Sequence, residues 1–362
     1  MPQRPRHGEC YNTIVPMFTQ NVAHALFPLG LDHRGTDPHP RQPPPMLLQR
    51  ADKMRASPDW LFEPKWDGFR TLASVHDGSV RLISRNGHLF THVFEPITDA
   101  LRGFPTSIVL DGEVVCVNGK GRPDFEALQA RLRPRDGKLP GHLCYMVFDC
   151  LHVNGYSLLN RPLEERQAVL RHLQPALQSD EVKLTEAFPA EKSAALLKAC
   201  TKMGLEGIVM KRKGSIYRPG LRTMDWLKVP IRHREEFVVG GYLPSPRGYS
   251  TLILGQFNRE GKYAYVGFCG NGLSDDTRAM IVEELRARHR KTCPFRIVPD
   301  LRDGFREVPD TPPRWVRPTL VVEVEYRQRL RDGLRHAALK GVRPDKRLGL
   351  FRRSPLGERE PC

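Results

Sequence analysis

The sequence lacks several features that would place it in familiar protein classes. None of its eight cysteines forms a Cys-x-x-Cys pair, so neither a zinc finger nor a zinc ribbon is indicated. No apolar run is long enough to cross a membrane, and the N-terminus has no basic start followed by an apolar core. The glycine-rich loops of Rossmann and P-loop nucleotide sites are also missing. We therefore expect a protein of a reducing cytosol that uses none of these devices.

Acidic residues are scarce relative to basic ones. The chain of 362 residues carries 57 Lys and Arg against 41 Asp and Glu, which gives a net charge of +16. With 40% hydrophobic residues, the composition is that of a globular protein with a sizeable core. The surplus of positive charge indicates a polyanionic partner, most often nucleic acid, although a basic surface can also serve solubility alone.

Composition divides the chain into two domains flanked by tails. Residues 1–42 are rich in His, Pro and Arg, favour polyproline II near their end, and are expected to be disordered. A basic, proline-marked break begins at Pro230 and separates a domain at 43–230 from a second domain at 231–355. Residues 356–362 are expected to form a short C-terminal tail.

Short strands alternate with helices in the first domain, which favours an α+β fold with antiparallel sheets over a doubly wound parallel sheet. The expected strands lie at 69–75, 80–84, 107–117 and 143–150. Four helices are expected. The first carries Phe94, Ile97 and Leu101, and the second begins after the N-cap Asp124. The third carries Leu163, Leu170 and Leu173, and the fourth runs over 190–202 and ends before the C-cap Gly204.

The second domain is rich in strands and has one helix. The expected strands lie at 236–243, 251–258, 262–268 and 319–326. The helix is expected to start at a cap, Ser274, and to carry Met280, Ile281 and Leu285. This pattern suits a small barrel of the OB kind, a frequent binder of nucleic acids.

The stretch 63–70 presents a lysine in extended sequence. Pro64 disfavours a helix there, and Gly68 permits a tight turn or a close approach of the backbone to a ligand. A lysine amine is a nucleophile when it is neutral, and a nearby cation such as Arg70 favours the neutral form. The alternative is a surface turn in which Lys65 is simply solvated.

Acidic residues stand at the start of two stretches that are expected to be apolar strands. Asp111-Gly112-Glu113 opens one stretch, and Glu206 opens the other. Acids at such places often only face solvent, but two of them form a candidate pair for a divalent cation, Mg²⁺ or Mn²⁺.

Cations and an aromatic residue complete the candidate site. Arg85 stands in a turn at 84–87, Lys211 ends an apolar stretch, and Lys228 alternates with Trp226. Phe148 is a candidate for stacking on a base, with core packing as the alternative. A lysine nucleophile, two carboxylates and several cations are what nucleotidyl transfer requires, because the chemistry depends on positioning, Mg²⁺ and charge on the phosphate oxygens.

Seven stretches occur in the order and spacing found in one enzyme family. They are 63–70, 84–87, 111–115, 145–150, 206–212, 226–228, and Arg343-Pro344-Asp345-Lys346 after Leu334-Arg335-His336. On these motifs, residues 43–353 resemble the ATP-dependent DNA ligases of the covalent nucleotidyltransferase superfamily. In detail they resemble small bacterial ligases related to the ligase domain of end-joining enzymes.

The resemblance implies an antiparallel-sheet nucleotidyltransferase, or adenylation, domain followed by a small OB-fold domain. Lys65 would form a phosphoramide with AMP from ATP, AMP would pass to a DNA 5′-phosphate, and a 3′-hydroxyl would then seal the strand. The implied metal ligands are Glu113 and Glu206. The implied ATP contacts are Glu63, Arg70, Arg85, Glu113, Phe148, Lys211, Lys228, Arg343 and Lys346, the last two moving in with the OB domain to orient pyrophosphate.

The resemblance also implies partners and a setting. The substrate would be nicked or broken double-stranded DNA in end joining or excision repair, and a Ku-like end-binding protein is a further partner by analogy alone. The chain is expected to act as a monomer in the cytoplasm of a bacterium, associated with the nucleoid.

The chain departs from the family in two ways. The family often has a second lysine two residues after the one at 228, but here Pro230 stands at that place, and Arg232 or Arg234 could supply the charge. No large helical DNA-clamping domain precedes the core, and no polymerase or nuclease module is seen. The grip on DNA would therefore come from the basic core, the OB domain or a partner.

Three other functions remain open. Nicotinamide-dependent ligases share the lysine chemistry but add a cofactor domain and a four-cysteine zinc module, neither of which is visible. An RNA ligase or a capping guanylyltransferase would use the same chemistry on another substrate. A non-catalytic, basic OB-containing binding protein would lack catalytic residues, whereas here only the position at 230 departs.

Overall fold

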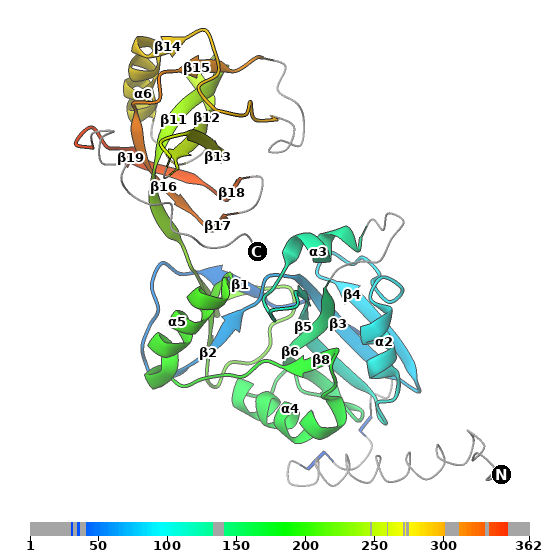
Figure 1. Cartoon of the computed structure of the whole chain (residues 1–362). Coiled ribbons are helices and arrows are strands. Elements are labelled where there is room, and N and C mark those ends of the chain that lie inside the picture. Colours follow the sequence, from blue (N-terminus) through cyan, green and yellow to red (C-terminus); the bar gives the residue numbers. More distant parts are fainter. Residues whose placement is uncertain are drawn as a thin grey trace, which may run out of the picture. The chain divides into compact units, whose positions relative to one another are not determined.

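The computed structural model describes most of the chain. The described residues are 30–31, 35–36, 41–132, 141–246, 248–258, 260–270, 272, 275–300, 311–329 and 333–346. They divide into two compact units on either side of the bond between Ile231 and Arg232. Each unit is described separately below (Figure 1).

The first unit is built on two sheets. The larger has the order β4-β3-β5-β6-β7, with β8 pairing β6 in parallel and every other pair antiparallel. Its strands are β3 (Phe69–His76), β4 (Ser79–Ser84), β5 (Ile108–Val117), β6 (His142–Val153), β7 (Tyr156–Ser157) and β8 (Val182–Leu184). The four long strands confirm the strands predicted from the sequence.

The smaller sheet has the order β1-β10-β9-β2. Its strands are β1 (Leu47–Arg50), β2 (Trp60–Lys65), β9 (Gly207–Arg212) and β10 (Arg222–Pro230). The β2–β9 and β9–β10 pairs are antiparallel, and the β1–β10 pair is parallel. Lys65 is therefore the last residue of β2, directly opposite Gly207, the first residue of β9.

Helices cover the outer faces of the two sheets. They are α2 (Glu95–Arg102), α3 (Phe125–Ala130), α4 (Leu163–Leu177), the 3₁₀ turn η2 (Ala190–Lys192) and α5 (Ser193–Met203). The predicted caps are confirmed, because Asp124 accepts a hydrogen bond from the Ala127 N–H at 2.9 Å and Gly204 is left-handed with φ of 74°. None of the helices in the described part of the chain is both long and apolar enough to span a membrane.

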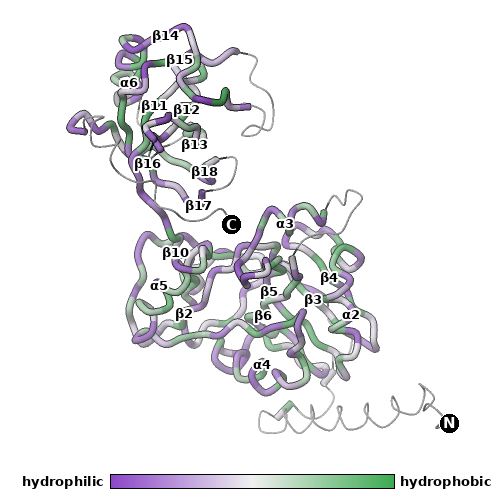
Figure 2. Tube along the Cα trace, in the orientation of Figure 1, coloured by the Kyte–Doolittle hydropathy of each residue, from purple (hydrophilic) through white to green (hydrophobic). Residues whose placement is uncertain are grey.

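The two sheets meet across a buried cluster. Leu72, Val109 and Leu151 come from the larger sheet, and Trp226 comes from the smaller one. The opposite face of the larger sheet forms the main core with α2 and α4. The helix α5 packs on the smaller sheet. Figure 2 shows the hydrophobic segments of β5 and β6 that form this core. The space between the sheets is where the candidate site lies.

Part of the expected N-terminal tail packs on the first unit. Leu31 belongs to the main core, and the Gly35 N–H donates to the Asn154 carbonyl at 2.8 Å. The side-chain amide of Gln42 donates to the carbonyls of Leu72 and Arg81. The expectation of a disordered tail therefore does not hold at these three residues. The other residues of 1–40 outside 30–31 and 35–36 lie outside the described part of the chain.

The second unit is a small barrel. Its main strands are β11 (His233–Ser245), β12 (Gly248–Phe257), β13 (Tyr263–Cys269), β16 (Val321–Tyr326) and β19 (Ala338–Val342), with α6 (Asp275–Ala287) between β13 and β16. The long β11 pairs with both β12 and β16, and β16 pairs with β19. Gly267 lies against the backbone of Leu334, so the edge of β13 approaches the last strands and nearly closes the barrel.

This arrangement is the OB fold predicted from the sequence. The four predicted strands are confirmed as β11, β12, β13 and β16. Short strands escaped prediction because two or three residues carry too little alternation: β14 (His289–Arg290), β15 (Arg314–Val316), β17 (Gln328–Arg329) and β18 (Leu334–Arg335). The predicted cap Ser274 lies outside the described residues.

Candidate active site

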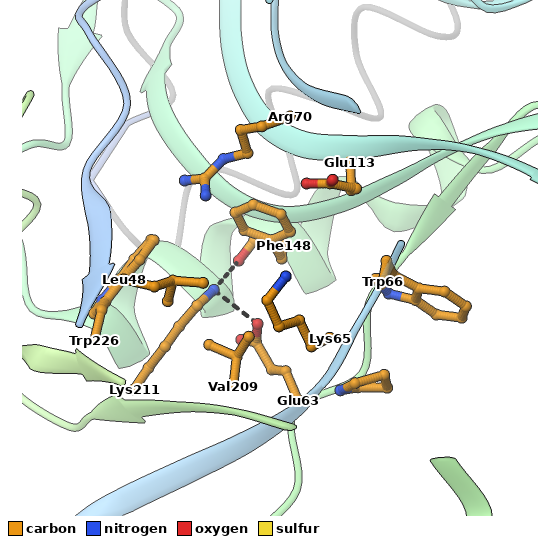
Figure 3. Close-up of a pocket in the computed structure, with 11 residues that line it drawn as sticks. Leu48, Glu63, Lys65, Trp66, Arg70, Glu113, Phe148, Val209, Lys211 and Trp226 are labelled. Atoms are coloured by element: carbon orange, nitrogen blue, oxygen red, sulfur yellow. Dashed lines mark hydrogen bonds and ion pairs between the residues drawn. The ribbon is translucent and has the colours of Figure 1, made fainter. Parts of the chain in front are cut away.

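A pocket of about 360 Å³, part of it open to solvent, lies between the two sheets of the first unit (Figure 3). The pocket brings together residues from both sheets. It is lined by Leu48, Glu63, Pro64, Lys65, Trp66, Arg70, Glu113, Phe148, Val209, Lys211 and Trp226. Six of the ten predicted ATP-binding or catalytic residues are among them.

Lys65 reaches the pocket from the end of β2. The β2–β9 ladder places its Nζ against the carboxylate of Glu206, the residue just before β9. After Lys65 the chain leaves this sheet and joins the larger one, passing very close to β5. A Cβ on Gly68 would lie 2.0 Å from the Val114 carbonyl oxygen, so only glycine fits there. The sequence predicted a tight turn or a close approach to a ligand at Gly68, whereas the close approach found here is to the neighbouring strand β5.

Glu63 and Lys211 form a buried ion pair on the floor of the pocket. Their charged atoms lie 2.8 Å apart, and the two side chains are 2% and 1% exposed. The other Glu63 oxygen accepts a hydrogen bond from Gln167 at 2.9 Å. Burial raises the pKa of Glu63, and the contact with Lys211 acts in the opposite direction. Both charges are thus held by fixed partners.

Phe148 lies between two cations. Its ring centroid is 4.3 Å from Lys211 Nζ and 4.6 Å from the guanidinium carbon of Arg70. Trp226 packs edge-on against it, with ring centroids 6.4 Å apart. In Figure 3 the Phe148 ring projects into the pocket, where a flat ligand could stack on it.

A two-pronged contact with the buried carboxylate of Asp111 holds Arg70 in place. Its Nε and Nη2 donate to the two oxygens of Asp111 at 2.5 and 2.6 Å, and Tyr217 donates to the same carboxylate at 2.6 Å. Burial by itself lowers the pKa of Arg70, but the contact with Asp111 more than offsets it and raises the pKa above its usual value. Sequence reasoning named Asp111 only as an acid beside Glu113, and did not foresee this role.

Glu113 lies opposite Arg70 on the neighbouring strand. Burial raises its pKa to about 7, against the lowering effect of Lys65 and Arg70, and the charge of Glu206 adds to the rise. The sequence predicted that Asp111 and Glu113 stand at the start of a strand, and this was wrong: both lie in the middle of β5, with apolar residues on either side. For Glu206 the same prediction is confirmed.

The two carboxylates fit a magnesium ion. Mg²⁺ in nucleotide sites is usually held by one or two carboxylates together with phosphate oxygens. Glu113 and Glu206 interact electrostatically: burial is the main cause of the raised pKa of Glu113, and the charge of Glu206 adds to it. No group of three or more His, Cys, Asp and Glu side chains able to hold a metal was found in the described residues, and a site completed by phosphates does not need one.

Lys228 and Arg85 lie beside the pocket rather than in its lining. Burial lowers the pKa of Lys228, and the positive charges of Lys65, Arg222 and Arg85 act in the same direction. Arg85 is exposed, and its N–H donates to the Arg70 carbonyl at 2.9 Å, which ties its turn to β3. The structure therefore brings these two predicted residues into the neighbourhood of Lys65.

Arg343 and Lys346 belong to the second unit. There Arg343 contacts Glu236 at 2.6 Å and Glu323 at 3.9 Å, and a two-pronged contact joins it to Asp345. These partners raise the pKa of the exposed Arg343 and lower that of Asp345. Lys346 approaches Glu236 at 3.6 Å. The two predicted residues thus form one cluster with carboxylates of the barrel.

Pro230 is the last residue of β10, where it pairs with Gly207. The two arginines considered as substitutes for a lysine there have partners in the second unit. Arg234 contacts Glu325 at 3.1 Å, and Arg232 lies 3.5 Å from the His336 carbonyl oxygen.

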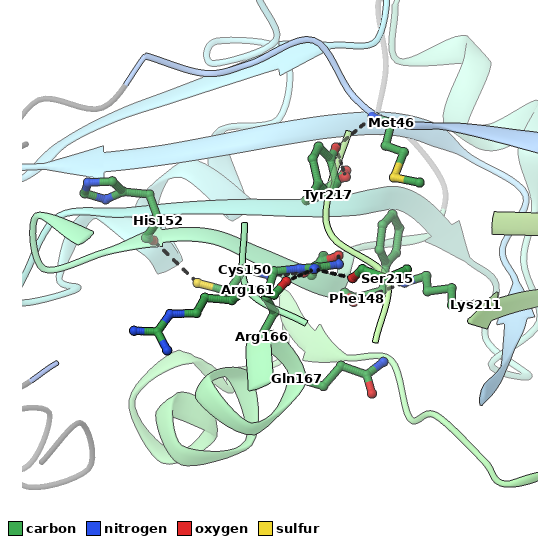
Figure 4. Close-up of polar contacts among 12 residues, drawn as sticks. Met46, Phe148, Cys150, His152, Arg161, Arg166, Gln167, Lys211, Ser215 and Tyr217 are labelled. Atoms are coloured by element: carbon green, nitrogen blue, oxygen red, sulfur yellow. Dashed lines mark hydrogen bonds and ion pairs between the residues drawn. The ribbon is translucent and has the colours of Figure 1, made fainter. Parts of the chain in front are cut away.

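A second set of buried polar residues escaped sequence reasoning (Figure 4). Arg166 on α4 is fully buried and grips both oxygens of Asp149, at 2.8 and 2.9 Å. Because Asp149 follows Phe148, this contact helps to orient the aromatic residue. Gln167, which holds Glu63, is on the same helix. One pattern in the sequence could have revealed them. Arg166 and Gln167 are polar but lie three and four residues after Leu163, on the apolar face of the helix.

A lysine beside two carboxylates, with a stacking ring and several cations, defines a nucleotide-binding site of the nucleotidyltransferase type. Family models agree with this class. Residues 45–229 match the ATP dependent DNA ligase domain, and residues 245–346 match the ATP dependent DNA ligase C terminal region. The chain belongs to the family of ATP-dependent DNA ligases, with an adenylation domain of α+β fold and an OB-fold domain.

Individual relatives support the family. The chain is 34% identical over 354 residues to the multifunctional non-homologous end joining protein LigD of Pseudomonas aeruginosa, covering 96% of this chain and 41% of that relative. It therefore spans about two fifths of the length of LigD. DNA ligase C1 of Mycolicibacterium smegmatis is 32% identical over 318 residues, covering 80% of this chain and 85% of the relative.

A solved structure shows the same fold. The structure described as Pmar-Lig_PreS3 has a TM-score of 0.55 and 20% identity, covering 78% of this chain and 63% of that chain.

Proposed function

We propose that this protein seals DNA breaks between a 3′-hydroxyl and a 5′-phosphate, using ATP and passing through a lysyl-AMP and an AMP–DNA intermediate. The observation that supports it best is the position of Lys65. Its amine lies at the meeting point of the two sheets, beside Glu206 and Glu113 and next to a pocket with a stacking ring. Family membership supports the same reaction.

In the first step the lone pair of Lys65 Nζ attacks the α-phosphorus of ATP. The bond from that phosphorus to the bridging oxygen breaks, pyrophosphate leaves with the electron pair, and the amine loses a proton. Glu206 is the nearest carboxylate and is placed to receive this proton. The backbone pairing of β2 with β9 keeps the amine in position. Positioning of the reacting groups is the main contribution of a protein to phosphoryl transfer.

The pocket residues would bind the rest of the nucleotide. Phe148 would offer the face on which adenine stacks, and Glu63, on β2 in the other sheet, would accept a hydrogen bond from the nucleotide. Arg70, held in place by Asp111, would contact the nucleotide from the larger sheet. Lys211 would add a positive charge to the pocket from β9 of the smaller sheet. Lys228 and Arg85 would contact phosphate oxygens beside Lys65.

Glu113 and Glu206 would hold Mg²⁺, which when bound would supply positive charge to the phosphate oxygens. Burial and the charge of Glu206 raise the pKa of Glu113 to about 7, and a divalent cation would favour the charged form of both carboxylates. Mn²⁺ favours the same carboxylate and phosphate oxygens, so it would be a substitute.

We assign residues 43–230 to the adenylation domain and 231–355 to the OB-fold domain. The division of the chain between Ile231 and Arg232 agrees with this assignment. Arg343 and Lys346 would contact the pyrophosphate part of ATP and later withdraw, so that DNA can take its place.

End joining is the pathway that the relatives suggest. LigD is named as an end-joining protein, and DNA with a break is the matching substrate. A Ku-like end-binding protein is a partner of the same proposal. The two other functions have less support. An RNA ligase or capping enzyme is disfavoured by the family models, and a non-catalytic binding protein would not need the full set of residues around Lys65.

The proposal is tested by covalent labelling and by sealing. Incubation with [α-³²P]ATP and Mg²⁺ should label the protein, and Lys65→Ala should abolish the label, whereas Lys53→Ala, an exposed lysine upstream, should not. A label that survives in Lys65→Ala contradicts the proposed nucleophile. Sealing of nicked DNA, nicked RNA and cohesive-ended duplexes with ATP, GTP or NAD then separates the three functions.

A further inference from the structure

The carboxylate of Glu63 is held at both of its oxygens. Lys211 Nζ lies 2.8 Å from Oε2, and the side-chain amide of Gln167 donates a hydrogen bond to Oε1 at 2.9 Å. The proposed function gives Glu63 a contact with the nucleotide and gives Lys211 a charge for the pocket. It gives no task to Gln167, whose side chain is buried behind Glu63 and does not line the pocket.

The helix α4 anchors the Gln167 side chain. Its neighbour Arg166 is fully buried and donates to both oxygens of Asp149. The same guanidinium donates to the backbone carbonyls of Arg161 and Ser215, at 2.6 and 2.9 Å (Figure 4). A functional group is positioned best when its support is itself locked by packing and hydrogen bonds. The amide of Gln167 therefore reaches Glu63 from an anchored turn of the helix.

Both contacts on Glu63 favour its charged form. Burial raises the pKa of this carboxyl, and the charge and hydrogen bond of Lys211 act against burial. A hydrogen bond donated by the Gln167 amide likewise favours the carboxylate over the neutral acid. A carboxylate has no proton to donate, so Glu63 is kept as a group that only accepts hydrogen bonds.

An acceptor near the stacking ring can distinguish one purine base from another. Glu63 and Phe148 both line the pocket, and Lys211 Nζ connects them, 2.8 Å from Glu63 and 3.2 Å from the Phe148 carbonyl oxygen (Figure 3). Adenine carries an amino group at C6, which donates hydrogen bonds, whereas guanine and hypoxanthine carry a carbonyl oxygen there, which accepts them. A charged Glu63 therefore favours adenine. A neutral Glu63 would lose this preference, because its O–H could donate to the carbonyl oxygen.

We propose that Gln167 is a positioning residue that makes the pocket select ATP over nucleotides with a 6-oxo purine, because its amide holds the Glu63 carboxylate ready to accept from the 6-amino group. This inference rests on the proposed function and deepens it, since it assigns the choice of base in the first step to a residue outside the pocket lining. A buried acceptor discriminates strongly, because a base without the matching donor leaves polar groups unpaired.

The test compares labelling of the full chain by [α-³²P]ATP and by [α-³²P]ITP, whose purine carries an oxygen at C6. For each nucleotide, the rate of labelling with Mg²⁺ is divided by the half-saturating nucleotide concentration. The wild-type protein should favour ATP by at least about 100-fold. Gln167→Met, which keeps an unbranched side chain but has no donor, should narrow this ratio about tenfold. Gln174→Met, at an exposed glutamine of the same helix, is the matched control and should leave the ratio unchanged.

A second variant connects the effect to Glu63. In Glu63→Gln the new amide can present either its oxygen or its nitrogen to the base, so the preference for ATP should already be small. Adding Gln167→Met to this variant should change the ratio less than about twofold, because the two residues act through one contact. The ratio is also insensitive to misfolding, since an unfolded fraction lowers labelling by both nucleotides equally. A merely structural Gln167 would slow labelling and leave the ratio intact.

The outcomes separate this inference from the function on which it rests. If neither nucleotide labels the wild-type protein, the proposed function itself is wrong. If ATP labels it, the inference is overturned by any of three results: equal labelling of the wild type by ATP and ITP, a wild-type ratio in Gln167→Met, or the same narrowing with Glu63→Gln in place. A narrowing in Gln167→Met that disappears in the Glu63→Gln protein supports it.

Discussion

The amine of Lys65 contacts the carboxylate of Glu206, although 141 positions separate the two residues in the chain. The antiparallel pairing of β2 with β9 produces this contact, because Lys65 lies opposite Gly207, the neighbour of Glu206. The nucleophile and a proposed metal ligand are therefore positioned by one ladder of backbone hydrogen bonds.

Replacing Glu206 should damage chemistry far more than folding. In Glu206→Gln, Lys65 loses its anionic neighbour and the metal loses a ligand, so the initial rate of labelling by [α-³²P]ATP should fall about 100-fold. The melting temperature should stay close to that of the wild type, because Glu206 precedes the first residue of β9 and its side chain is 19% exposed. A drop in melting temperature that parallels the loss of activity would indicate a structural role instead.

The carboxyl of Glu113 should give stability an unusual pH dependence. Its pKa is about 7 in the folded protein against 4.5 for the free group, so between these values the folded state binds more protons than the unfolded state. The stability that it contributes is therefore fully present below about pH 4.5 and is lost as the pH rises through 7. Relative to Glu113→Gln, the wild-type protein should become less stable between pH 5 and pH 7.5.

Melting curves with and without Mg²⁺ check this dependence. Added Mg²⁺ should restore stability to the wild-type protein above pH 7 and do little to Glu113→Gln, because only a charged carboxylate binds the ion. Parallel pH curves for the two proteins would contradict the raised pKa.

The buried pair of Glu63 and Lys211 should be costly to break. Lys211→Met leaves Glu63 buried without its cation, and the free energy of unfolding should fall by about 3–5 kcal/mol. The double variant Glu63→Gln with Lys211→Met should recover much of this loss, because no unpaired charge remains. The neighbouring Arg212→Met is the control: its contact with Asp225 is exposed and should be worth at most about 1 kcal/mol. Urea denaturation measures all three, and additive effects of the two substitutions would exclude the coupling.

Arg343 should matter for one step only. Glu236 and Glu323 lie opposite each other on β11 and β16, and Arg343 contacts both. If it orients pyrophosphate, Arg343→Ala should slow labelling by ATP at least tenfold more than it slows sealing of a nick that already carries AMP. Arg329→Ala, at an exposed arginine of the same unit that contacts Gln256 at 2.9 Å and Glu235 at 4.0 Å, should affect neither step. Equal losses in both steps would contradict a role limited to pyrophosphate.

Much of the fold could be predicted from local pattern. The strand-forming residues in 69–75 and 143–150 indicate strands directly, and Asp124 and Gly204 mark helix ends through contacts with their own neighbours in the chain. Short elements could not be found this way. β1 and β15, with four and three residues, exist because longer strands offer them free edges.

The candidate site was only partly predictable, because residues that support other residues have no motif of their own. Lys65, Glu113, Phe148 and Lys211 were identified by their order in the chain, and the pocket brings these four together. Asp111 gave no signal of its role, since its partners Arg70 and Tyr217 come from distant segments.

The sequence by itself determined the two-domain α+β and OB plan and the ordered set of charged residues, because patterns of period and spacing are properties of neighbouring residues. Tertiary structure decided the rest: which carboxylate faces Lys65 and which acid holds Arg70. These depend on the register of strands that are distant in the chain, where a shift by one residue would exchange the two faces of a sheet.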